Sequence, residues 1–399
     1  MSARRQKVLL AMSGGVDSSV AAALLLERGY DVVGVFMRRG SPGESRDELI
    51  ADATPAASAK PLKVGHQGCC SINDAADARL VAAGLGIPFY VVNFKKDFGR
   101  IMEYFAQEYT SGRTPNPCVR CNDWLKFGKL HDYARQIDAD LVATGHYARV
   151  QPGPDGQPAL MRGLDLDKDQ SYVLFGVPRD RLGQMLLPIG AMRKPDVREH
   201  ARRLGLPVFN KPDSQEICFI PDNDYAGFVE RQRPDAATPG NIIDADGRVL
   251  GRHAGQHRFT IGQRRGIGVA LGHPIFVIDR DPGANTVTVG QREHLLAQSC
   301  IAGEANWLVS DDQVPRDWTP CLAQFRSNAD PVPASVRALA KAPAEIPSDA
   351  PNYSGRDSWL EVRFDEPQEA VAPGQAIVIF DRADRLVGGG WIARARRIG

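Results

Sequence analysis

The stretch Ser13-Gly14-Gly15-Val16-Asp17-Ser18 follows an apolar run at residues 7–12 (KVLLAM) and leads into a helical pattern at residues 20–28. A strand, a glycine turn and a helix in this order are typical of a phosphate-binding site, because glycines let the backbone approach a phosphate and the free N–H groups at a helix start attract anions. No Gly-Lys-Ser or Gly-Lys-Thr follows, so the loop differs from that of enzymes that hydrolyse the γ-phosphate. A plain helix cap is the alternative, since Asp17 fits either a cap or a contact through a magnesium ion.

Strands and helices alternate over the first half of the chain. Predicted strands lie at residues 7–12, 31–37, 87–94 and 141–150, and predicted helices at 20–28, 74–86 and 98–112, with a helix-then-strand pattern at 198–209. The continuous apolar character of the second strand is typical of a parallel sheet. The alternation predicts a doubly wound α/β domain. Residues 39–67, rich in Gly, Ser, Pro and Ala, are predicted to form a long loop.

From Pro239 onward the pattern changes to short strands and turns. DADG and RDPGAN are turn signals, and residues 375–393 are typical of a β-hairpin. These patterns predict a small, mostly-β central domain followed by a C-terminal antiparallel β-barrel. The Pro- and Ala-rich residues 331–356 are predicted to hold a surface loop. We expect the three domains to span residues 1–212, 213–285 and 286–399.

The overall composition and charge limit how the chain could bind nucleic acid or associate with a membrane. A chain of 399 residues with a net charge of +1 must hold any nucleic-acid partner through local basic patches, because its overall field is nearly neutral. No apolar run approaches the roughly 20 residues of a membrane span. The apolar run at the N-terminus is short and leads straight into the glycine loop, which favours a buried strand over a signal peptide. We therefore expect a cytoplasmic protein with no membrane partner.

The seven cysteines are an odd number in a long chain without a signal peptide, so a disulfide scaffold is not expected. Cys118 and Cys121 form a Cys-x-x-Cys pair just before a helical pattern at 124–130, and a thiol near a helix start is a candidate for a lowered pKa. A structural zinc site would need a second such pair, and the sequence has none. Cys218 lies in a short apolar segment. Packing roles are predicted for the other four, Cys69, Cys70, Cys300 and Cys321.

The glycine loop resembles the pyrophosphate-binding PP-loop of the adenine nucleotide α-hydrolase superfamily, whose members cleave ATP between the α and β phosphates. Further segments run in one order along nearly the whole chain: GVFM, GRTPNPCVRCN, TGHYAR, KDQSYVL, DSQEICFI, GQRRGIG, PGQ and the final glycine run at 388–390. Together they closely resemble the tRNA-specific 2-thiouridylases of the MnmA/TrmU family. The resemblance implies a PP-loop catalytic domain, a central domain that carries Cys218, and a barrel that contacts tRNA.

The resemblance also implies a reaction. ATP with Mg²⁺ would activate the 2-carbonyl of the wobble uridine, position 34 of tRNA, and release AMP and pyrophosphate. A persulfide on Cys218 would deliver sulfur to give 2-thiouridine, and Cys121 would assist its release and close a transient Cys121–Cys218 disulfide. A sulfur-donor protein, either a cysteine desulfurase or a relay protein, would load Cys218.

The family motifs assign further site residues. Those expected at the ATP site are Ala11, Met12, Ser13, Gly14, Gly15, Val16, Asp17, Ser18, Met37 and Gly145. Those expected around the target base are Asn116, Pro117 and Cys118. Those expected to face tRNA are His146, Lys168, Asp169, Gln170, Gln324, Phe325, Arg326 and Gln375. Additional candidates for phosphate contacts are Lys211, Arg258, Arg264 and Arg265.

The sequence departs from the family pattern at two places. Many members have Asp where this chain has Cys118, and many have an Arg-Tyr pair where it has Gln324-Phe325-Arg326. Cys118, Cys121 and Cys218 would supply three thiolates for a 4Fe–4S cluster with one open iron. We favour the route without a cluster or other bound metal apart from Mg²⁺, because it needs only the two matched cysteines.

Two rival functions stay open from the sequence. An amide-forming ligase of the same superfamily would share the glycine loop but would need no cysteine pair. A tRNA-binding or redox-sensing protein would not need an intact loop. The cysteine motifs therefore argue against the first, and the loop argues against the second.

Overall fold

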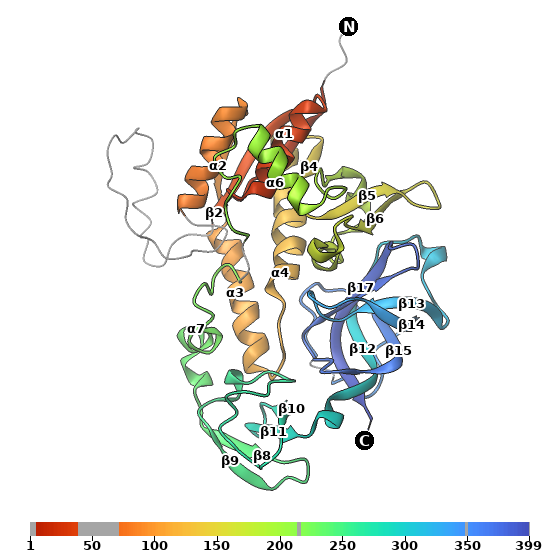
Figure 1. The fold of residues 1–399 in the computed structure, drawn as a ribbon. Coiled ribbons are helices and arrows are strands. Elements are labelled where there is room, and N and C mark those ends of the chain that lie inside the picture. Colours follow the sequence, from red (N-terminus) through yellow and green to blue (C-terminus); the bar gives the residue numbers. More distant parts are fainter. Residues whose placement is uncertain (1–4, 39–71, 214–216, 348–349, 399) are drawn as a thin grey trace, which may run out of the picture.

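The computed structural model describes residues 5–38, 72–213, 217–347 and 350–398. The predicted loop at 39–67 and the predicted packing of Cys69 and Cys70 lie outside these residues. The chain forms an α/β unit, a small central sheet and a closed barrel, in that order along the sequence (Figure 1). The observed architecture confirms the predicted fold class.

The first unit is built on a parallel sheet with the strand order β3-β2-β1-β4-β7. Its strands are β1 (Lys7–Ala11), β2 (Asp31–Arg38), β3 (Phe89–Asn93), β4 (Leu141–Ala143) and β7 (Met185–Leu186). Along β1, Val8 and Leu10 pack into one hydrophobic cluster, and Leu9 and Ala11 into another on the opposite face. This period of two separates the two faces of the sheet, so both faces bury apolar side chains.

Helices cover both faces, as the doubly wound prediction requires. One face carries α1 (Val16–Glu27), α2 (Ile72–Leu85) and α6 (Lys194–Arg203). The other carries α3 (Lys95–Thr110) and α5 (Leu130–Gln136). Figure 1 shows α3 reaching from this unit toward the central sheet. The first helix was predicted to start at residue 20, but α1 starts at Val16, directly after the glycines.

A helical rod contains the Cys118–Cys121 pair in its first turns. It runs without interruption through α4 (Pro117–Arg120), the π-helical η2 (Cys121–Lys129) and α5. Asn116 caps the rod, since its side-chain oxygen accepts a hydrogen bond from the Val119 N–H at 3.3 Å, and Pro117 fits the first turn. The helix predicted at 124–130 therefore starts seven residues earlier, and π-helical turns are frequent at functional sites.

Two predicted strands are wrong. Residues 141–150 do not form one strand, because the chain leaves the sheet after Ala143 and re-forms in the hairpin of β5 (Ala148–Pro152) and β6 (Pro158–Arg162). Residues 206–209 form no strand, because the chain after α6 continues into a turn at 207–210. The short helices that follow these hairpin strands are η3 (Leu166–Lys168), η4 (Ser171–Leu174), η5 (Arg179–Gln184) and α7 (Tyr225–Gln232).

The central unit is a four-stranded sheet of order β10-β11-β8-β9 with its own apolar core. Its strands are β8 (Gly240–Ile243), β9 (Val249–His253), β10 (Phe276–Asp281) and β11 (Thr286–Gly290), with η6 (Pro234–Ala236), η7 (Gln256–Arg258) and η8 (Arg292–Leu295) beside them. The β11–β8 pair is parallel, and the other pairs are antiparallel.

The last unit is a closed antiparallel barrel, as predicted, with the strand order β12-β15-β14-β13-β16-β17. Its strands are β12 (Leu296–Trp307), β13 (Thr319–Gln324), β14 (Val332–Leu339), β15 (Trp359–Glu369), β16 (Ala376–Phe380) and β17 (Leu386–Arg397), with η9 (Asp311–Gln313) between β12 and β13. The predicted hairpin at 375–393 is β16–β17.

Part of the predicted loop at 331–356 is instead the barrel strand β14. Ala334 and Val336 alternate into the barrel core, and this period of two was masked by the high proline and alanine content. Cys300 and Cys321 pack in the same core, as predicted, and burial raises the pKa of Cys321 to about 12. Within the described part of the chain, no helix combines the length and apolar character needed to span a membrane.

Candidate functional site

The glycine loop has a closed, tightly packed geometry. Gly14 has φ +73°, and a Cβ there would lie 2.2 Å from the Asp74 carbonyl oxygen, so this position requires glycine. The Ser13 N–H donates to Ser18 Oγ at 3.1 Å, and the Ser19 hydroxyl donates to the Gly15 carbonyl at 2.8 Å.

Gly145 closes the loop from the other side. A Cβ at this position would lie 2.7 Å from the Ser18 nitrogen, so the turn after β4 packs directly on the start of α1. Ala11 and Met12 are buried at the end of β1, and Met37 is half-buried at the end of β2. The predicted ATP residues thus gather where the carboxyl ends of β1, β2 and β4 meet, which is where doubly wound sheets bind ligands.

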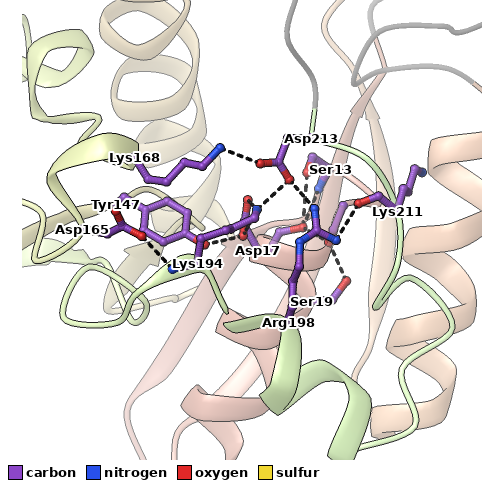
Figure 2. A network of polar contacts seen from close by, with 12 residues as sticks. Ser13, Asp17, Ser19, Tyr147, Asp165, Lys168, Lys194, Arg198, Lys211 and Asp213 are labelled. Carbon is purple, nitrogen blue, oxygen red and sulfur yellow. Dashed lines mark hydrogen bonds and ion pairs between the residues drawn. The ribbon is translucent and has the colours of Figure 1, made fainter. Parts of the chain in front are cut away.

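Asp17 lies in the first turn of α1, and its carboxylate is held by two side chains. Its carboxylate accepts hydrogen bonds from the Tyr147 hydroxyl at 2.7 Å and from Lys194 Nζ at 2.8 Å to each oxygen (Figure 2). Burial, and then the Asp17 charge, raise the pKa of Tyr147, so this hydroxyl stays protonated and donates. The N-cap of α1 is Gly15 with no side-chain cap bond, so the alternative of Asp17 as a plain cap is wrong.

Asp213 gathers three cations beside Asp17. Its carboxylate lies 2.8 Å from Lys194 Nζ, 2.8 Å from Arg198 Nη2 and 3.0 Å from Lys168 Nζ (Figure 2). Burial alone would raise the pKa of Asp213, but the hydrogen bonds from Lys194 and Lys168 outweigh it and leave the pKa below its usual value. Lys194 is therefore shared between the glycine loop and the segment that leads to Cys218.

Lys211 ties the same segment to the loop at a second point. Its ammonium donates to the Gly14 carbonyl at 3.0 Å, to Asp74 at 2.7 Å and to Asp77 at 2.6 Å. Four basic side chains therefore lie in the polar network beside the loop, each paired with a carboxylate: Lys168, Lys194, Arg198 and Lys211 (Figure 2). Side chains of this kind bind polyphosphates. Sequence reasoning missed Lys194, Arg198 and Asp213, because a single charged residue at the start of a helix or in a turn has no local signature.

Two of the predicted thiols lie against one apolar cluster. Cys121, at the start of η2, and Cys218 both pack on the group formed by Phe94, Phe98, Ile101 and Leu125. Met37 of the predicted ATP set packs on the same group. Cys121 and Cys218 are half-buried, whereas Cys118 is exposed. The fold therefore brings Cys121 and Cys218 to one place although 97 positions separate them in the sequence.

A metal cluster would need at least three ligating side chains gathered at one place. Across residues 5–38, 72–213, 217–347 and 350–398, no group of three or more His, Cys, Asp or Glu side chains is arranged to hold a metal ion. The three cysteines of the alternative 4Fe–4S site do not form such a group in this arrangement. We therefore derive no reaction step through a cluster.

His146 is buried beneath the loop turn. Its Nδ1 lies 2.7 Å from Thr144 Oγ1, and its Nε2 lies 3.3 Å from Lys126 Nζ. An ammonium can only donate, so Nε2 accepts and the neutral ring carries its proton on Nδ1. Burial, and then the Lys126 charge, hold the pKa of His146 well below its usual value. In this arrangement the ring is covered, and its contact with tRNA stays a prediction.

Asp169 and Gln170 bind the local backbone. Asp169 accepts the Gly163 and Ser171 N–H groups at 2.8 and 3.1 Å, and Gln170 accepts the Tyr147 N–H at 3.0 Å. Both residues therefore hold the turn beside Tyr147, whose hydroxyl reaches Asp17. Their predicted tRNA contacts, and that of half-buried Lys168, are not tested by this geometry.

The barrel residues predicted to face tRNA differ in exposure. Gln324 and Phe325 are buried in the barrel, whereas Arg326 is exposed and donates to the Glu369 and Ala370 carbonyls. Gln375 donates to the Thr114 and Pro115 carbonyls at 3.1 and 3.3 Å, immediately before Asn116 and Pro117. It therefore supports the predicted base-binding segment from the barrel side.

A doubly wound sheet whose first strand and helix are joined by this loop defines the chain as a PP-loop protein. Family models agree: a tRNA methyl transferase HUP domain matches residues 6–222, a tRNA methyl transferase PRC-barrel domain matches 226–291, and an aminomethyltransferase beta-barrel domain matches 353–392. The chain is 46% identical over 98% of its length to the tRNA-specific 2-thiouridylase MnmA of Rhodopirellula baltica, covering 96% of that protein. It is also 46% identical, over 98% of each chain, to the MnmA of Carboxydothermus hydrogenoformans. The chain belongs to the family of tRNA-specific 2-thiouridylases.

Solved structures are more distant. A 4-thiouridine synthetase–RNA complex with bound ATP is 18% identical, with a TM-score of 0.34, over 58% of this chain and 51% of the other. The U34-tRNA thiolase NcsA of Methanococcus maripaludis with its [4Fe-4S] cluster is 17% identical, with a TM-score of 0.32, over 58% and 68%. Similarity at this level carries no argument for or against a cluster in this chain.

Proposed function

We propose that this chain is an ATP-dependent tRNA-uridine 2-sulfurtransferase that replaces the 2-carbonyl oxygen of the wobble uridine, position 34, with sulfur in the cytoplasm. The observation that carries the proposal is the packing of Cys121 and Cys218 on one apolar cluster that also contacts Met37 at the edge of the nucleotide site. An amide ligase would have no use for two thiols there. Family membership supports the same activity.

ATP provides the activation that the substrate needs. The carbonyl of a uracil ring is a poor electrophile, and its oxygen becomes a leaving group only when it carries AMP. The glycine loop offers backbone N–H groups to a polyphosphate, and the network beside it supplies the basic side chains of Lys168, Lys194, Arg198 and Lys211.

Asp17 fits a magnesium ion by its chemistry. It is the carboxylate of the glycine loop and its side chain is 31% exposed, and one carboxylate together with phosphate oxygens is a usual Mg²⁺ environment. When bound, Mg²⁺ would neutralise phosphate charge. In this structure Lys194 and Tyr147 hold the same carboxylate through hydrogen bonds.

The two thiols divide the sulfur chemistry. The terminal sulfur of a Cys218 persulfide attacks C2 of the adenylated uridine, and AMP leaves with the former carbonyl oxygen. The Cys121 thiolate then attacks Cys218 Sγ, which breaks the S–S bond, leaves one sulfur on the base and forms a Cys121–Cys218 disulfide. A thiol reductant restores both cysteines, and a cysteine desulfurase or sulfur relay protein reloads Cys218.

The target base enters beside the start of the helical rod. Asn116 and Pro117 would border it, and a base in an anticodon loop is unpaired, so it can be turned into a pocket at lower cost than a duplex base. We keep the division into a catalytic domain at 1–212, a central domain at 213–285 and a tRNA-contacting barrel at 286–399 as part of this proposal. The tRNA contacts proposed for His146, Lys168, Asp169, Gln170, Gln324, Phe325, Arg326 and Gln375 belong to it as well.

Product analysis tests the proposed function. With unmodified tRNA, ATP, Mg²⁺ and a persulfide donor, we expect 2-thiouridine in the nucleosides and one AMP and one pyrophosphate for each sulfur transferred, because the loop lacks the Gly-Lys pair of γ-phosphate hydrolases. Mass spectrometry of digested tRNA and chromatography of the nucleotides give both quantities. Release of ADP and phosphate, or unmodified tRNA in the complete mixture, would contradict the proposal.

Cys118 distinguishes the persulfide route from a cluster route. Because Cys118 is exposed and the persulfide route uses only Cys121 and Cys218, we expect Cys118→Asp to keep thiolation within about threefold of wild type and anaerobically purified protein to contain no stoichiometric iron. Iron and sulfide analysis beside the thiolation assay provides the measurement. Stoichiometric iron that is lost together with activity in Cys118→Ser would overturn this expectation and favour the 4Fe–4S alternative.

A further inference from the structure

Arg120 is a charged side chain buried within the segment that carries the proposed reactive groups. It follows Asn116 and Pro117 and directly precedes Cys121, yet its residue is only 1% exposed. The guanidinium forms a two-bond ion pair with Glu304 of the barrel strand β12, at 2.8 and 3.1 Å. Two parallel hydrogen bonds between a guanidinium and a carboxylate fix the relative orientation of the two planar groups as well as the distance between them.

Four aromatic rings enclose this guanidinium. Arg120 Cζ lies 4.0 Å from the centre of the Trp391 ring and 5.2–5.3 Å from the rings of Tyr104, Trp124 and Tyr353. The rings come from α3, from η2, from the segment before β15 and from β17, so the catalytic unit and the barrel both contribute. Such a cage favours the cation and excludes water from the ion pair.

Glu304 is held in an unusual backbone conformation. Its φ is +50°, in the left-handed region that non-glycine residues rarely adopt, and it lies where the β12–β17 register shifts. Its carboxylate also accepts the Ser354 N–H at 2.7 Å. Backbone strain of this kind persists where the surroundings determine it, which is consistent with a position set by the contact with Arg120.

The barrel also holds the other end of the same segment. The Thr114 N–H donates to the Pro373 carbonyl at 2.8 Å, and Gln375 donates to the Thr114 and Pro115 carbonyls. Gly374 has φ +89°, and a Cβ there would lie 2.9 Å from Arg113 Cβ and from the Thr114 backbone. The residues from 114 to 120 are therefore attached to the barrel at both ends.

The ion pair between Arg120 and Glu304 fixes how the first turns of the helical rod are rotated about the helix axis. Successive residues on a helix point about 100° apart, so fixing Arg120 toward the barrel directs Cys121 to its own face, where it meets the cluster shared with Cys218. At a side-chain radius of about 5 Å, a rotation of about 20° would move the thiol by nearly 2 Å. A misplacement of only about 1 Å can cost about 100-fold in rate.

We propose that Arg120 is a positioning residue for sulfur transfer, which uses Glu304 of the barrel to fix the Cys121 thiol relative to Cys218 and to the base-binding residues. The proposal rests on the proposed function. It makes the barrel a structural part of the thiolation site in addition to a surface for tRNA.

The test uses Arg120→Lys in the full-length protein. Lysine keeps the charge and most of the volume but loses the two-bond geometry. We expect kcat for 2-thiouridine formation to fall about 100-fold, while the KM for tRNA and the loading of Cys218 with persulfide sulfur stay within about threefold of wild type. Glu304→Gln keeps one accepting oxygen in a side chain of the same shape. We expect its kcat for 2-thiouridine formation to fall less than that of Arg120→Lys.

Asn306→Ala is the matched control. Asn306 also lies buried in β12 and joins the barrel to the catalytic unit, but the hydrogen bonds of its side-chain amide go to the Phe175 and Val177 carbonyls and not to the Asn116–Cys121 segment. At temperatures where all variants are folded by circular dichroism, we expect this control to keep more than about a third of the wild-type kcat. An equal loss in Asn306→Ala and Arg120→Lys would mean that barrel attachment in general matters, and would overturn the role of Arg120.

A second readout does not depend on the proposed reaction. Without tRNA or ATP, mild oxidation should join Cys121 and Cys218 at least about tenfold more slowly in Arg120→Lys than in wild type, because the thiols no longer meet in the fixed geometry. Peptide mapping by mass spectrometry follows this disulfide. Wild-type protein that forms the disulfide but makes no 2-thiouridine would refute the proposed function alone, whereas unchanged disulfide formation in Arg120→Lys would refute the positioning role.

Discussion

Cys218→Ser will make no 2-thiouridine and will carry no persulfide, whereas Cys121→Ser will load sulfur on Cys218 and then stop. The difference follows from the proposed roles. Cys218 Sγ forms the bond to the transferred sulfur, and Cys121 is needed only to break that bond once the sulfur is on the base. Both thiols pack on the same cluster of Phe94, Phe98, Ile101 and Leu125, so the two variants separate two roles at one location.

The measurement is radiolabelled or mass-resolved sulfur on each purified variant, followed by nucleoside analysis of tRNA. In Cys121→Ser we expect a trapped conjugate in which Cys218 is joined to tRNA through the transferred sulfur. Cys300→Ser is the control, since Cys300 is fully buried in the barrel and burial raises the pKa of its thiol, so it should thiolate at close to the wild-type rate. Turnover by Cys121→Ser at the wild-type rate would refute the resolving role.

Asp17→Ala should lower the rate of AMP and pyrophosphate release by about 100-fold or more, by analogy with the loss of other preorganised charges. The carboxylate holds Lys194 and Tyr147 at 2.8 and 2.7 Å. Its removal leaves Lys194 paired with Asp213 alone, and the carboxylate oxygens that we propose as Mg²⁺ ligands are lost. Pyrophosphate release in a single turnover with tRNA and persulfide-loaded protein measures the effect.

Asp77→Ala is the matched control for this prediction. Asp77 is also a carboxylate paired with a lysine beside the loop, but it binds Lys211, which keeps Asp74 and the Gly14 carbonyl as partners. We expect it to retain more than about a third of the wild-type rate. If Asp17→Ala were as active as Asp77→Ala, Asp17 would have no part in binding metal or phosphate and would serve only to hold Lys194 and Tyr147.

Features with a local period or a local motif could be read from the sequence. The alternation of predicted strands and helices predicted the doubly wound sheet, and the hairpin at 375–393 predicted the closing pair of the barrel. The prediction was wrong where the residue composition of a segment hid its structure. In β14 the prolines and alanines hid a strand whose Ala334 and Val336 fill the barrel core, and after β4 an apolar run concealed the turn at Thr144 and Gly145.

The glycine loop and the two cysteines that we propose for sulfur transfer could be selected from the sequence, because each lies in a contiguous motif. The sequence by itself thus determined the type of phosphate site and the residue types available for sulfur transfer. It did not show that Lys194 joins Asp17 to Asp213 or that Arg120 pairs with Glu304, because these partners lie 177, 19 and 184 positions apart and a single charged residue has no periodic signal.

Only the tertiary structure decided these pairings. Desolvation makes an isolated buried charge so costly that a buried guanidinium such as Arg120 needs a partner, yet that rule names no partner in advance. The partner is selected by which strand and helix come together when the sheet and the barrel pack. The sequence therefore determined which reactive side chains are present. The packing of β12 and β17 against α3 and the helical rod determined the direction of the Cys121 thiol.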